Sequence, residues 1–442
     1  MKTTFVRGAR AVAFAALALA AAVSAAVAQP LPAAKPEQVG LSSQRLQRLT
    51  DTFRQEIEQG KLPGAVIMVA RKGKLVYSEA LGFQDPAAKT PMKADTIFRA
   101  YSMTKPLASV AAMMLVEEGK VMLTDPLSKF FPACRGMTVS VPRADSVYAR
   151  VTYATVPAER EITVQDLLRH TSGLAYGEIT QNAPVRDAYV KGGLFLQGTR
   201  DYDSRDLTPA EFVERLCKAP LAQQPGTLWE YSLSVDMLGR VVEAASGKRL
   251  ADFLDERMFR PLKMADTAFW VPKEKLARLA QPFDKDPATG TPNKLIDVTA
   301  VPKNDSGGAG AMTTAGDYLR FAQAMLNGGQ LDGQRILSRS TVALMTSDHL
   351  GSAIATPTQP GQLLMGVPGY TFGLGFMVRQ GPGIAGVPGS AGEFMWAGYA
   401  GTFFWVDPKE ELAVVYMTQA PSPIRAYYRR LTKQLVYQAI VD

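Results

Sequence analysis

The sequence is poor in histidine and cysteine. Its 442 residues include two of each, namely His170, His349, Cys134 and Cys217. No cluster of His, Cys, Asp or Glu has the spacing of metal ligands, so we expect neither a metal nor another cofactor. The two cysteines permit one disulfide in an oxidising compartment, and two buried free thiols are the alternative.

Long runs of basic residues are also missing. Lysine and arginine together number 49, against 41 acidic residues, but the basic residues are scattered along the chain. A nucleic-acid-binding arm needs them clustered, so nucleic acid is excluded as an expected partner.

One apolar run stands apart from the rest, at the N-terminus. Lys2, Arg7 and Arg10 precede an alanine-rich stretch that ends in an A-x-A sequence at residues 26–28. This order predicts a cleavable signal peptide over residues 1–28, with an uncleaved membrane anchor as the alternative. Cleavage would remove three basic residues and no acids, which lowers the formal net charge from +8 to +5. No other stretch is long enough to cross a membrane, so we expect a periplasmic or secreted protein without a membrane span after cleavage.

The two ends of the mature chain share one pattern of elements. Residues 42–60 predict a helix, and residues 64–82 and 401–419 each predict two strands joined by a turn. Residues 424–441 predict a second helix. These elements predict an antiparallel sheet that takes strands from both ends of the chain and is flanked by the terminal helices.

The middle of the chain is rich in predicted helices. They cover residues 107–118, 163–169, 208–218, 232–246 and 250–259. We therefore predict an α+β fold for the mature chain, residues 29–442. An α/β part (about 29–101 and 295–442) would hold an inserted, mostly helical part (about 102–294). Two stretches, 177–206 and 351–392, predict loops over the cleft between the parts, where ligands often bind.

The stretch YSMTKP, residues 101–106, places Ser102 three residues before Lys105. This S-x-x-K spacing alone is weak evidence, because a helix cap followed by a solvated lysine has the same pattern. Pro106 fits only in the first turn of a helix, and the preceding TIFRA predicts a strand. Ser102 is therefore expected at a helix N-terminus, where its backbone N–H and the helix dipole favour a developing oxyanion.

A serine nucleophile needs a base, which is most often histidine. We interpret His170, in LLRHTSGL, as a structural hydrogen-bonding residue at a helix C-terminus, and we expect His349 at the surface. The chain also has no G-x-S-x-G sequence, so a Ser-His-Asp triad is disfavoured. Lys105 is the nearest alternative base, provided that burial or a neighbouring cation removes its proton.

Five sequence stretches, in one order, carry a family resemblance. They are DTIFRAYSMTKP, ITVQDLLRHTSGL, PGTLWEYSLSVDMLGRVVEAASG, GGAGAMTTAGDYLRFAQAMLNGG and WAGYAGTFFWVDP. Together they extend from about residue 40 to the C-terminus. In them the chain resembles the superfamily of serine β-lactamases and penicillin-binding proteins, specifically class C β-lactamases and family VIII carboxylesterases. The resemblance implies a β-lactamase-like fold.

The resemblance also implies catalytic roles for three side chains. Ser102 would be the acylated nucleophile and Lys105 its partner, while Tyr231, in the tyrosine motif of residues 231–233, would be the second base. Without the motif, Tyr231 would be interpreted as a core aromatic residue behind Trp229. A lysine cation favours a neighbouring phenolate, so the sequence leaves open which of the two groups accepts the serine proton.

The third family motif matches the sequence Trp-Ala-Gly that begins at Trp396 and ends at Gly398. The resemblance implies that both of these residues lie in the substrate-binding site. The next backbone N–H, that of Tyr399, would complete an oxyanion hole with the N–H of Ser102.

Two departures from the class C lactamases bear on the substrate. Those enzymes usually have asparagine where this chain has Leu233, and lysine where it has Trp396. Both changes remove polar recognition and add apolar surface, and W-x-G is what family VIII esterases show. The alternative is that Trp396 merely packs and that other residues bind the substrate.

We therefore expect a serine hydrolase that cleaves short-chain carboxylic esters through an acyl-enzyme on Ser102 with a Lys/Tyr base. The enzymatic alternatives are a transacylase and an amide hydrolase, namely a weak β-lactamase, a D-amino-acid peptidase or a linear-amide hydrolase. The non-enzymatic alternative is an inactive penicillin-binding-like protein that binds cell-wall fragments. The expected partner is a small-molecule ester or amide, and the oligomeric state stays open.

Overall fold

The computed structural model describes residues 30–145, 150–195 and 205–442. The predicted signal peptide, residues 1–28, lies outside the described residues. Within the described ranges, no helix combines the length and the apolar character that a membrane crossing requires.

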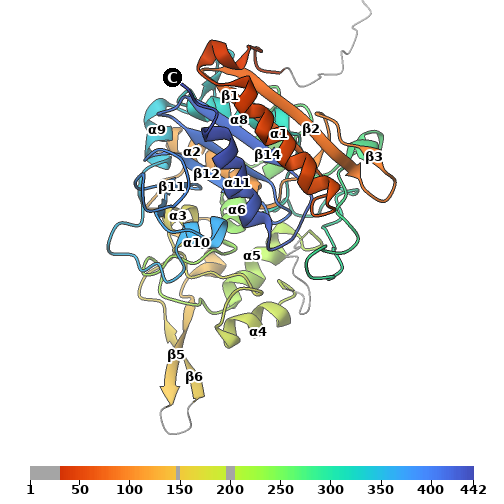
Figure 1. Ribbon diagram of the computed structural model, residues 1–442. Helices are drawn as coiled ribbons and strands as arrows, with labels where there is room; N and C mark the ends of the chain where they lie inside the picture. The colour runs from red at the N-terminus through yellow and green to blue at the C-terminus, as the bar shows by residue number, and fades with distance from the viewer. Residues whose placement is uncertain (1–29, 146–149, 196–204) are drawn as a thin grey trace, which may run out of the picture.

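One eight-stranded sheet takes segments from both ends of the chain (Figure 1). Its strand order is β10-β11-β12-β13-β14-β1-β2-β3, and all neighbouring strands are antiparallel. The N-terminal β1 pairs with the C-terminal β14, with Ile67 opposite Tyr416, which confirms the predicted sheet. The strands are β1 (Gly64–Arg71), β2 (Lys74–Asp85), β3 (Thr90–Pro91), β10 (Tyr370–Phe372), β11 (Met377–Arg379), β12 (Phe394–Ala397), β13 (Phe403–Asp407) and β14 (Leu412–Met417).

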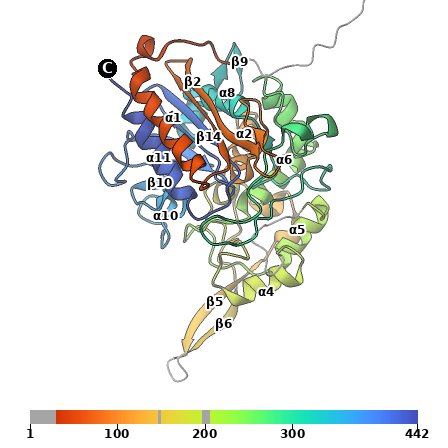
Figure 2. The same cartoon turned by 45° about the vertical axis from the view of Figure 1, so that its right-hand side comes forward.

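Helices cover both faces of this sheet (Figures 1 and 2). The predicted terminal helices, α1 (Ser43–Glu58) and α11 (Arg425–Tyr437), lie side by side on one face. On the other face, α8 (Ala315–Leu326) packs against β1, β13 and β14. Strand β1 is buried along its whole length, because a strand between two helical layers needs apolar side chains on both faces.

The middle of the chain forms the predicted helices. They are α2 (Thr104–Glu117), α3 (Val164–Leu168), α5 (Pro209–Lys218), α6 (Ser234–Ser246) and α7 (Leu250–Leu254), which continues into a π-helical turn (Asp255–Phe259). Helix α2 is buried from Thr104 to Leu115 and packs on α6, as its all-round apolar sequence predicted. The division into two parts near residues 101 and 295 stays a prediction.

A two-stranded arm, β5 (Thr138–Asp145) and β6 (Arg150–Pro157), extends away from the rest of the molecule (Figures 1 and 2). The two strands pair with each other, with Val139 opposite Val156, and Val139 also forms an isolated bridge with Leu221. The sequence analysis missed the arm. Pro142 lies inside the first strand, and proline weakens the strand signal.

The two predicted loops contain regular structure, so the prediction of loops there was wrong in part. The first includes α4 (Ala183–Lys191), and the second includes α10 (Pro360–Met365) together with β10 and β11. These elements are short, and periodicity over so few residues gives little signal. The remaining short elements are β4 (Phe98–Arg99), β7 (Met312–Thr313), β8 (Gln330–Leu331), β9 (Gln334–Arg335) and α9 (Arg339–Met345).

A disulfide joins Cys134 to Cys217. Cys134 ends a 3-10 turn (Pro132–Cys134), and Cys217 lies on the buried side of α5. Of the two alternatives that the sequence left open, the structure has the crosslinked one.

Candidate active site

The segment before Ser102 is held in a strained conformation. Strand β4 pairs with β7, and the chain then turns through Tyr101, whose φ is +47°. An aromatic residue avoids this left-handed region unless surrounding contacts impose it. Here the Tyr101 hydroxyl accepts the Ile296 N–H at 3.0 Å, and Thr104 Oγ1 donates to the Tyr101 carbonyl at 2.6 Å. Ser102 follows within a 3-10 turn (Tyr101–Met103) that leads directly into α2.

The structure brings the three predicted catalytic side chains together. The Tyr231 hydroxyl lies 2.6 Å from Ser102 Oγ, and Lys105 Nζ lies 3.5 Å from the same atom. Lys105 Nζ also lies 4.6 Å from the centre of the Tyr231 ring. Tyr231 therefore has the shorter hydrogen-bond path to the serine proton, with the lysine beside both groups.

Lys105 is almost completely buried, with 1% of its surface exposed. Besides Ser102, its ammonium donates to the Tyr176 hydroxyl at 2.8 Å and to the Gly308 carbonyl at 2.9 Å. These contacts satisfy all three N–H groups, as a buried ammonium requires. Sequence analysis missed Tyr176, because nothing in its local sequence distinguishes it from an ordinary buried tyrosine.

Asp236 lies behind this lysine and is also buried. Its Oδ1 accepts hydrogen bonds from Ser306 Oγ at 2.5 Å and from the Gly308 N–H at 3.1 Å. Burial raises the pKa of Asp236, and the Lys105 charge opposes that rise. A Cβ on Gly308 would lie 2.2 Å from the Asp236 carboxylate, so only glycine allows this approach. Nothing in the local sequence distinguishes Asp236 as a site residue.

The two histidines do not face the serine as bases. His170 is buried, its Nδ1 lies 3.2 Å from Ser232 Oγ, and its ring centre lies 5.1 Å from that of Tyr231. Burial, and then the charge of Lys105, lower the pKa of His170 well below its usual value, so the ring is neutral packing behind Tyr231. His349 is partly exposed, in agreement with its expected position at the surface, and its Nε2 lies 2.8 Å from the Leu344 carbonyl oxygen.

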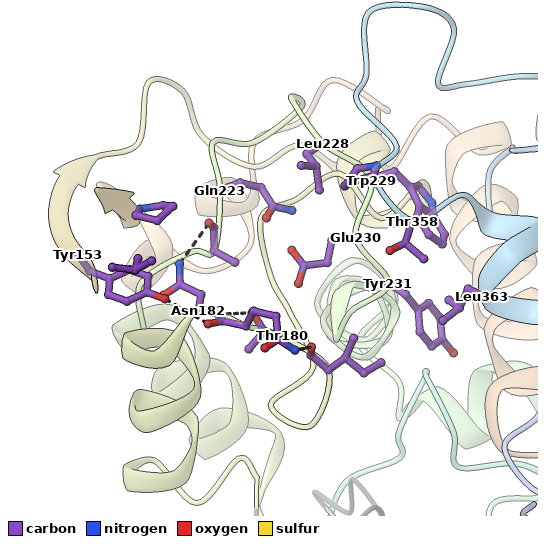
Figure 3. Close-up of a pocket in the computed structure, with 16 residues that line it drawn as sticks. Tyr153, Thr180, Asn182, Gln223, Leu228, Trp229, Glu230, Tyr231, Thr358 and Leu363 are labelled. Atoms are coloured by element: carbon purple, nitrogen blue, oxygen red, sulfur yellow. Dashed lines mark hydrogen bonds between the residues drawn. The ribbon is translucent and has the colours of Figure 1, made fainter. Parts of the chain in front are cut away.

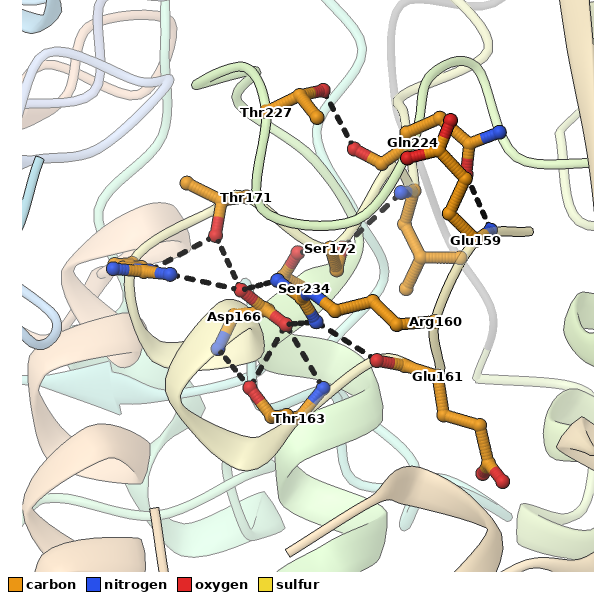
Figure 4. Close-up of polar contacts among 12 residues, drawn as sticks. Glu159, Arg160, Glu161, Thr163, Asp166, Thr171, Ser172, Gln224, Thr227 and Ser234 are labelled. Atoms are coloured by element: carbon orange, nitrogen blue, oxygen red, sulfur yellow. Dashed lines mark hydrogen bonds and ion pairs between the residues drawn. The ribbon is translucent and has the colours of Figure 1, made fainter. Parts of the chain in front are cut away.

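An ionic cluster around Asp166 fixes the loop that carries His170 (Figure 4). The buried Asp166 carboxylate pairs with Arg160 at 2.5 Å and Arg169 at 3.1 Å, and it accepts the Thr171 hydroxyl at 2.8 Å. Burial alone would raise the pKa of Asp166, but Arg160 and hydrogen bonds outweigh it and lower that pKa. A carboxylate that stays ionised therefore joins the segment before α3, through Arg160, to the turn after it, through Arg169 and Thr171.

The end of β12 lies directly against the backbone that precedes Ser102. A Cβ on Gly398 would be 2.3 Å from the Ala100 carbonyl oxygen, so glycine is required at this close approach. Thr402 Oγ1 donates to the same carbonyl at 3.1 Å, and Arg429 Nη2 donates to the Gly398 carbonyl at 2.7 Å. These contacts fix the residue after Gly398, Tyr399, relative to Ser102.

A cavity of about 360 Å³, here called the catalytic cavity, lies over Ser102. The two predicted loops contribute Glu178 and Ile179, and Leu363 and Leu364. Its lining residues are Tyr101, Ser102, Tyr176, Glu178, Ile179, Tyr231, Ala309, Leu363, Leu364, Trp396, Ala397, Gly398, Tyr399, Pro423, Arg425 and Arg429.

The predicted substrate-binding residues differ in their positions. Trp396 lines the catalytic cavity, and its ring centre lies 5.4 Å from that of Tyr231. Gly398 also lines it. Leu233 is fully buried at the start of α6 and is not part of the described lining, so the structure does not bring it to the substrate position.

The chain is similar to known proteins over most of its length. A family model described as Beta-lactamase matches residues 49–438. The chain belongs to the β-lactamase family. As a member of that family it has the β-lactamase-like fold predicted from its five motifs, and it is a serine hydrolase.

Several relatives of this β-lactamase-family protein are similar over most of its length. Protein Rv1367c of Mycobacterium tuberculosis is 35% identical over 376 residues, which are 83% of this chain and 88% of the relative. Esterase EstB of Burkholderia gladioli is 32% identical over 395 residues, 84% of this chain and 89% of the relative. The solved structure of EstCE1, described as a hydrolase with promiscuous acyltransferase activity, has a TM-score of 0.70 at 27% identity. The structural match covers 90% of this chain and 99% of the EstCE1 chain. The esterase relatives support the resemblance to family VIII.

Metal ligands are not gathered in the described part of this β-lactamase-family protein. There, no group of three or more His, Cys, Asp or Glu side chains could hold an ion.

Proposed function

We propose that the protein hydrolyses short-chain carboxylic esters through an acyl-enzyme on Ser102. The observation that carries the proposal is the 2.6 Å contact between the Tyr231 hydroxyl and Ser102 Oγ, with Lys105 Nζ 3.5 Å from the same oxygen. A nucleophile, a neighbouring base and a group that orients the base are the minimum for acyl transfer at serine.

The reaction takes place in two steps. Ser102 Oγ forms a bond to the ester carbonyl carbon while its proton passes to the Tyr231–Lys105 pair. The carbonyl oxygen becomes an oxyanion, for which we assign the backbone N–H groups of Ser102 and Tyr399. The C–O bond to the alcohol then breaks and the alcohol takes the proton. Water repeats the sequence and releases the acid.

The lining of the catalytic cavity supports an ester with small apolar groups. Ile179 and Leu363 present apolar surface there. Trp396, which stands where lactamases have a lysine that binds a substrate carboxylate, lines the cavity with 1% of its surface exposed. The relative named Esterase EstB supports the same substrate class.

Transacylation is the second candidate. The similar structure of EstCE1 is described as a hydrolase with promiscuous acyltransferase activity, and the acyl-enzyme proposed here would react with any alcohol or amine that outcompetes water. Adding a primary alcohol to the ester assay and measuring the new ester distinguishes the two outcomes.

The test compares p-nitrophenyl acetate and butyrate with nitrocefin, for wild type and Ser102→Ala. We expect ester turnover that rises with pH, because the Tyr–Lys pair must lose a proton, little nitrocefin turnover, and no turnover in the variant. Faster nitrocefin turnover would favour an amide hydrolase. Failure of a fluorophosphonate to label Ser102 would favour the non-catalytic cell-wall-binding alternative.

We also propose that the protein is exported to the periplasm or secreted. The N-terminal pattern of residues 1–28 supports export, and so does the Cys134–Cys217 disulfide, because disulfides persist in oxidising compartments. N-terminal sequencing of the protein from fractionated cells tests this. A mature start near Gln29 is expected, and an intact Met1 would contradict it.

A further inference from the structure

A second cavity adjoins the catalytic cavity. It has a volume of about 490 Å³ and is called here the outer pocket (Figure 3). Tyr231, Ile179 and Leu363 line both cavities, so a molecule bound at Ser102 can extend past these three side chains. Its other walls include Tyr153, Gln223, Leu228, Trp229 and Glu230.

Glu230 is the charged side chain of this pocket. Figure 3 shows it in the middle of the lining, with its carboxylate directed away from the Tyr231 ring. Burial raises the pKa of Glu230, and the neighbouring side chains of Gln223 and Thr180 oppose the rise. Among the described residues no lysine or arginine forms an ion pair with it. A partly buried carboxylate without a cation is unfavourable, and binding a cation would relieve that cost.

Two other polar side chains of the outer pocket, Asn182 and Thr180, are occupied by the protein itself, whereas Gln223 Nε2 has no partner within hydrogen-bond distance among the described residues. Asn182 accepts the Ser140 hydroxyl at 2.8 Å and donates to the Ser140 carbonyl at 2.8 Å. The Thr180 hydroxyl accepts the Asn182 N–H at 3.2 Å. The aromatic ring of Tyr153 remains as a wall of the outer pocket, and aromatic faces attract cations. Trp229, in contrast, is buried and packs against His170 and Phe372. The Glu230 carboxylate and the Tyr153 ring therefore match a cation.

The proposed chemistry indicates which half of an ester lies on this side. Tyr231 returns the proton to the departing alcohol, so the alcohol oxygen must come within hydrogen-bond distance of the Tyr231 hydroxyl. Glu230 is the neighbouring residue in the chain, and Tyr231 forms a wall of both cavities. The alcohol half of the substrate is therefore the half that extends toward Glu230.

We propose that the outer pocket binds a cationic group, an ammonium, on the alcohol half of the ester, with Glu230 as its counter-charge. This inference rests on the proposed esterase function and deepens it, because it makes the preferred substrate an ester of an amino alcohol. Glu230 acts here as a specificity-determining residue and takes no part in the bond-making steps.

The test uses two matched series of butyrate esters. In one series the alcohol chain ends in a trimethylammonium group, and in the other it ends in a tert-butyl group of the same shape without the charge. The chain is lengthened stepwise so that its end can reach Glu230. The measured quantity is the ratio of kcat/KM for the charged ester to kcat/KM for its neutral partner, in one enzyme at a time.

Wild type is expected to prefer the charged ester on the order of tenfold at the best chain length, as one close, partly desolvated charge pair can give. Glu230→Gln should bring the ratio to about one. The matched control is Glu214→Gln, which changes an exposed carboxylate of α5 that lines neither cavity and should keep the wild-type ratio. A ratio of one in wild type at every length, or the wild-type ratio in Glu230→Gln, overturns the proposal.

A binding measurement separates this proposal from the esterase proposal. The free trimethylammonio alcohols are titrated calorimetrically into Ser102→Ala protein and into Ser102→Ala/Glu230→Gln protein. If wild type hydrolyses no ester, the proposed function fails, while binding that needs Glu230 still supports the cation site. Equal binding to both proteins, or none to either, overturns the cation site whatever the activity.

Discussion

Asp236 and Lys105 contact the same residue, Gly308, from its two sides. Asp236 Oδ1 accepts the Gly308 N–H at 3.1 Å, and Lys105 Nζ donates to the Gly308 carbonyl at 2.9 Å. The acid and the base of this pair are both buried, so their charges stabilise each other through a medium of low polarity. Gly308 thus connects a carboxylate outside the catalytic cavity to the proposed catalytic lysine by two hydrogen bonds.

The first prediction concerns the pH dependence of the reaction. Asp236→Asn keeps an oxygen that can accept the Gly308 N–H but removes the negative charge that favours the Lys105 cation. The lysine should then lose its proton more readily, so the rising limb of the pH–rate profile should move toward lower pH. The measurement is kcat/KM for p-nitrophenyl butyrate across pH.

A matched control for that experiment is Asp317→Asn. Asp317 is another buried aspartate, but it accepts the Asp266 N–H and the Thr267 hydroxyl at the start of α8 and lines neither cavity. Asp317→Asn should leave the rising limb of the pH–rate profile at its wild-type pH. If both variants shift this limb, or if neither does, the contacts through Gly308 do not set its position.

The second prediction compares the two tyrosines near Lys105. Tyr231→Phe removes the hydroxyl that lies 2.6 Å from Ser102 Oγ, and kcat should fall by about 10²–10⁴-fold, the range of a lost general base. Tyr176→Phe removes only a partner of Lys105 and should cost clearly less. Single-turnover assays with p-nitrophenyl acetate measure both acylation rates. A larger loss in Tyr176→Phe than in Tyr231→Phe would contradict the role of Tyr231 as the base.

The third prediction concerns the disulfide. Replacing Cys134 and Cys217 together by serine should lower the free energy of unfolding by about 4 kcal/mol, because the crosslink closes a long loop in the unfolded chain. Urea denaturation of both proteins measures this. Wild type treated with a reductant should approach the variant. Identical unfolding midpoints for oxidised wild type and variant would show that the crosslink is absent or unimportant.

The fourth prediction concerns stability against pH. Burial raises the pKa of Asp317 to about 6 from its ordinary 3.8. Its neutral form therefore favours the fold at low pH, and this contribution is lost as pH rises through the folded-state pKa. Asp317→Asn lacks the titration, so its stability relative to wild type should rise by about 2 kcal/mol between about pH 4 and pH 7. Urea midpoints at several pH values test this, and a constant difference would contradict it.

Local sequence was enough for the elements whose signal lies within a few residues. Ser42 caps α1 by accepting the Arg45 N–H, and the β1–β2 turn passes through Lys72 and Gly73 with positive φ, so the predicted helix and the predicted turn both depend on adjacent residues. The pairing of Ser102 with Lys105 is of this kind, because three residues are one turn of a helix.

What the sequence by itself determined is therefore the longer helices, the paired strands from the two ends of the chain and, through five motifs in order, the family and the three side chains that the fold brings together. Tertiary structure alone decided the groups that come from elsewhere in the chain. Lys105 contacts Tyr176, which is 71 positions away in the chain, and Gly308, which is 203 positions away. The pocket around Glu230 is lined by loops whose short elements the sequence did not predict. Periodicity reports which face of an element is buried, but it does not report which distant segment buries it. That choice depends on the packing of the whole core.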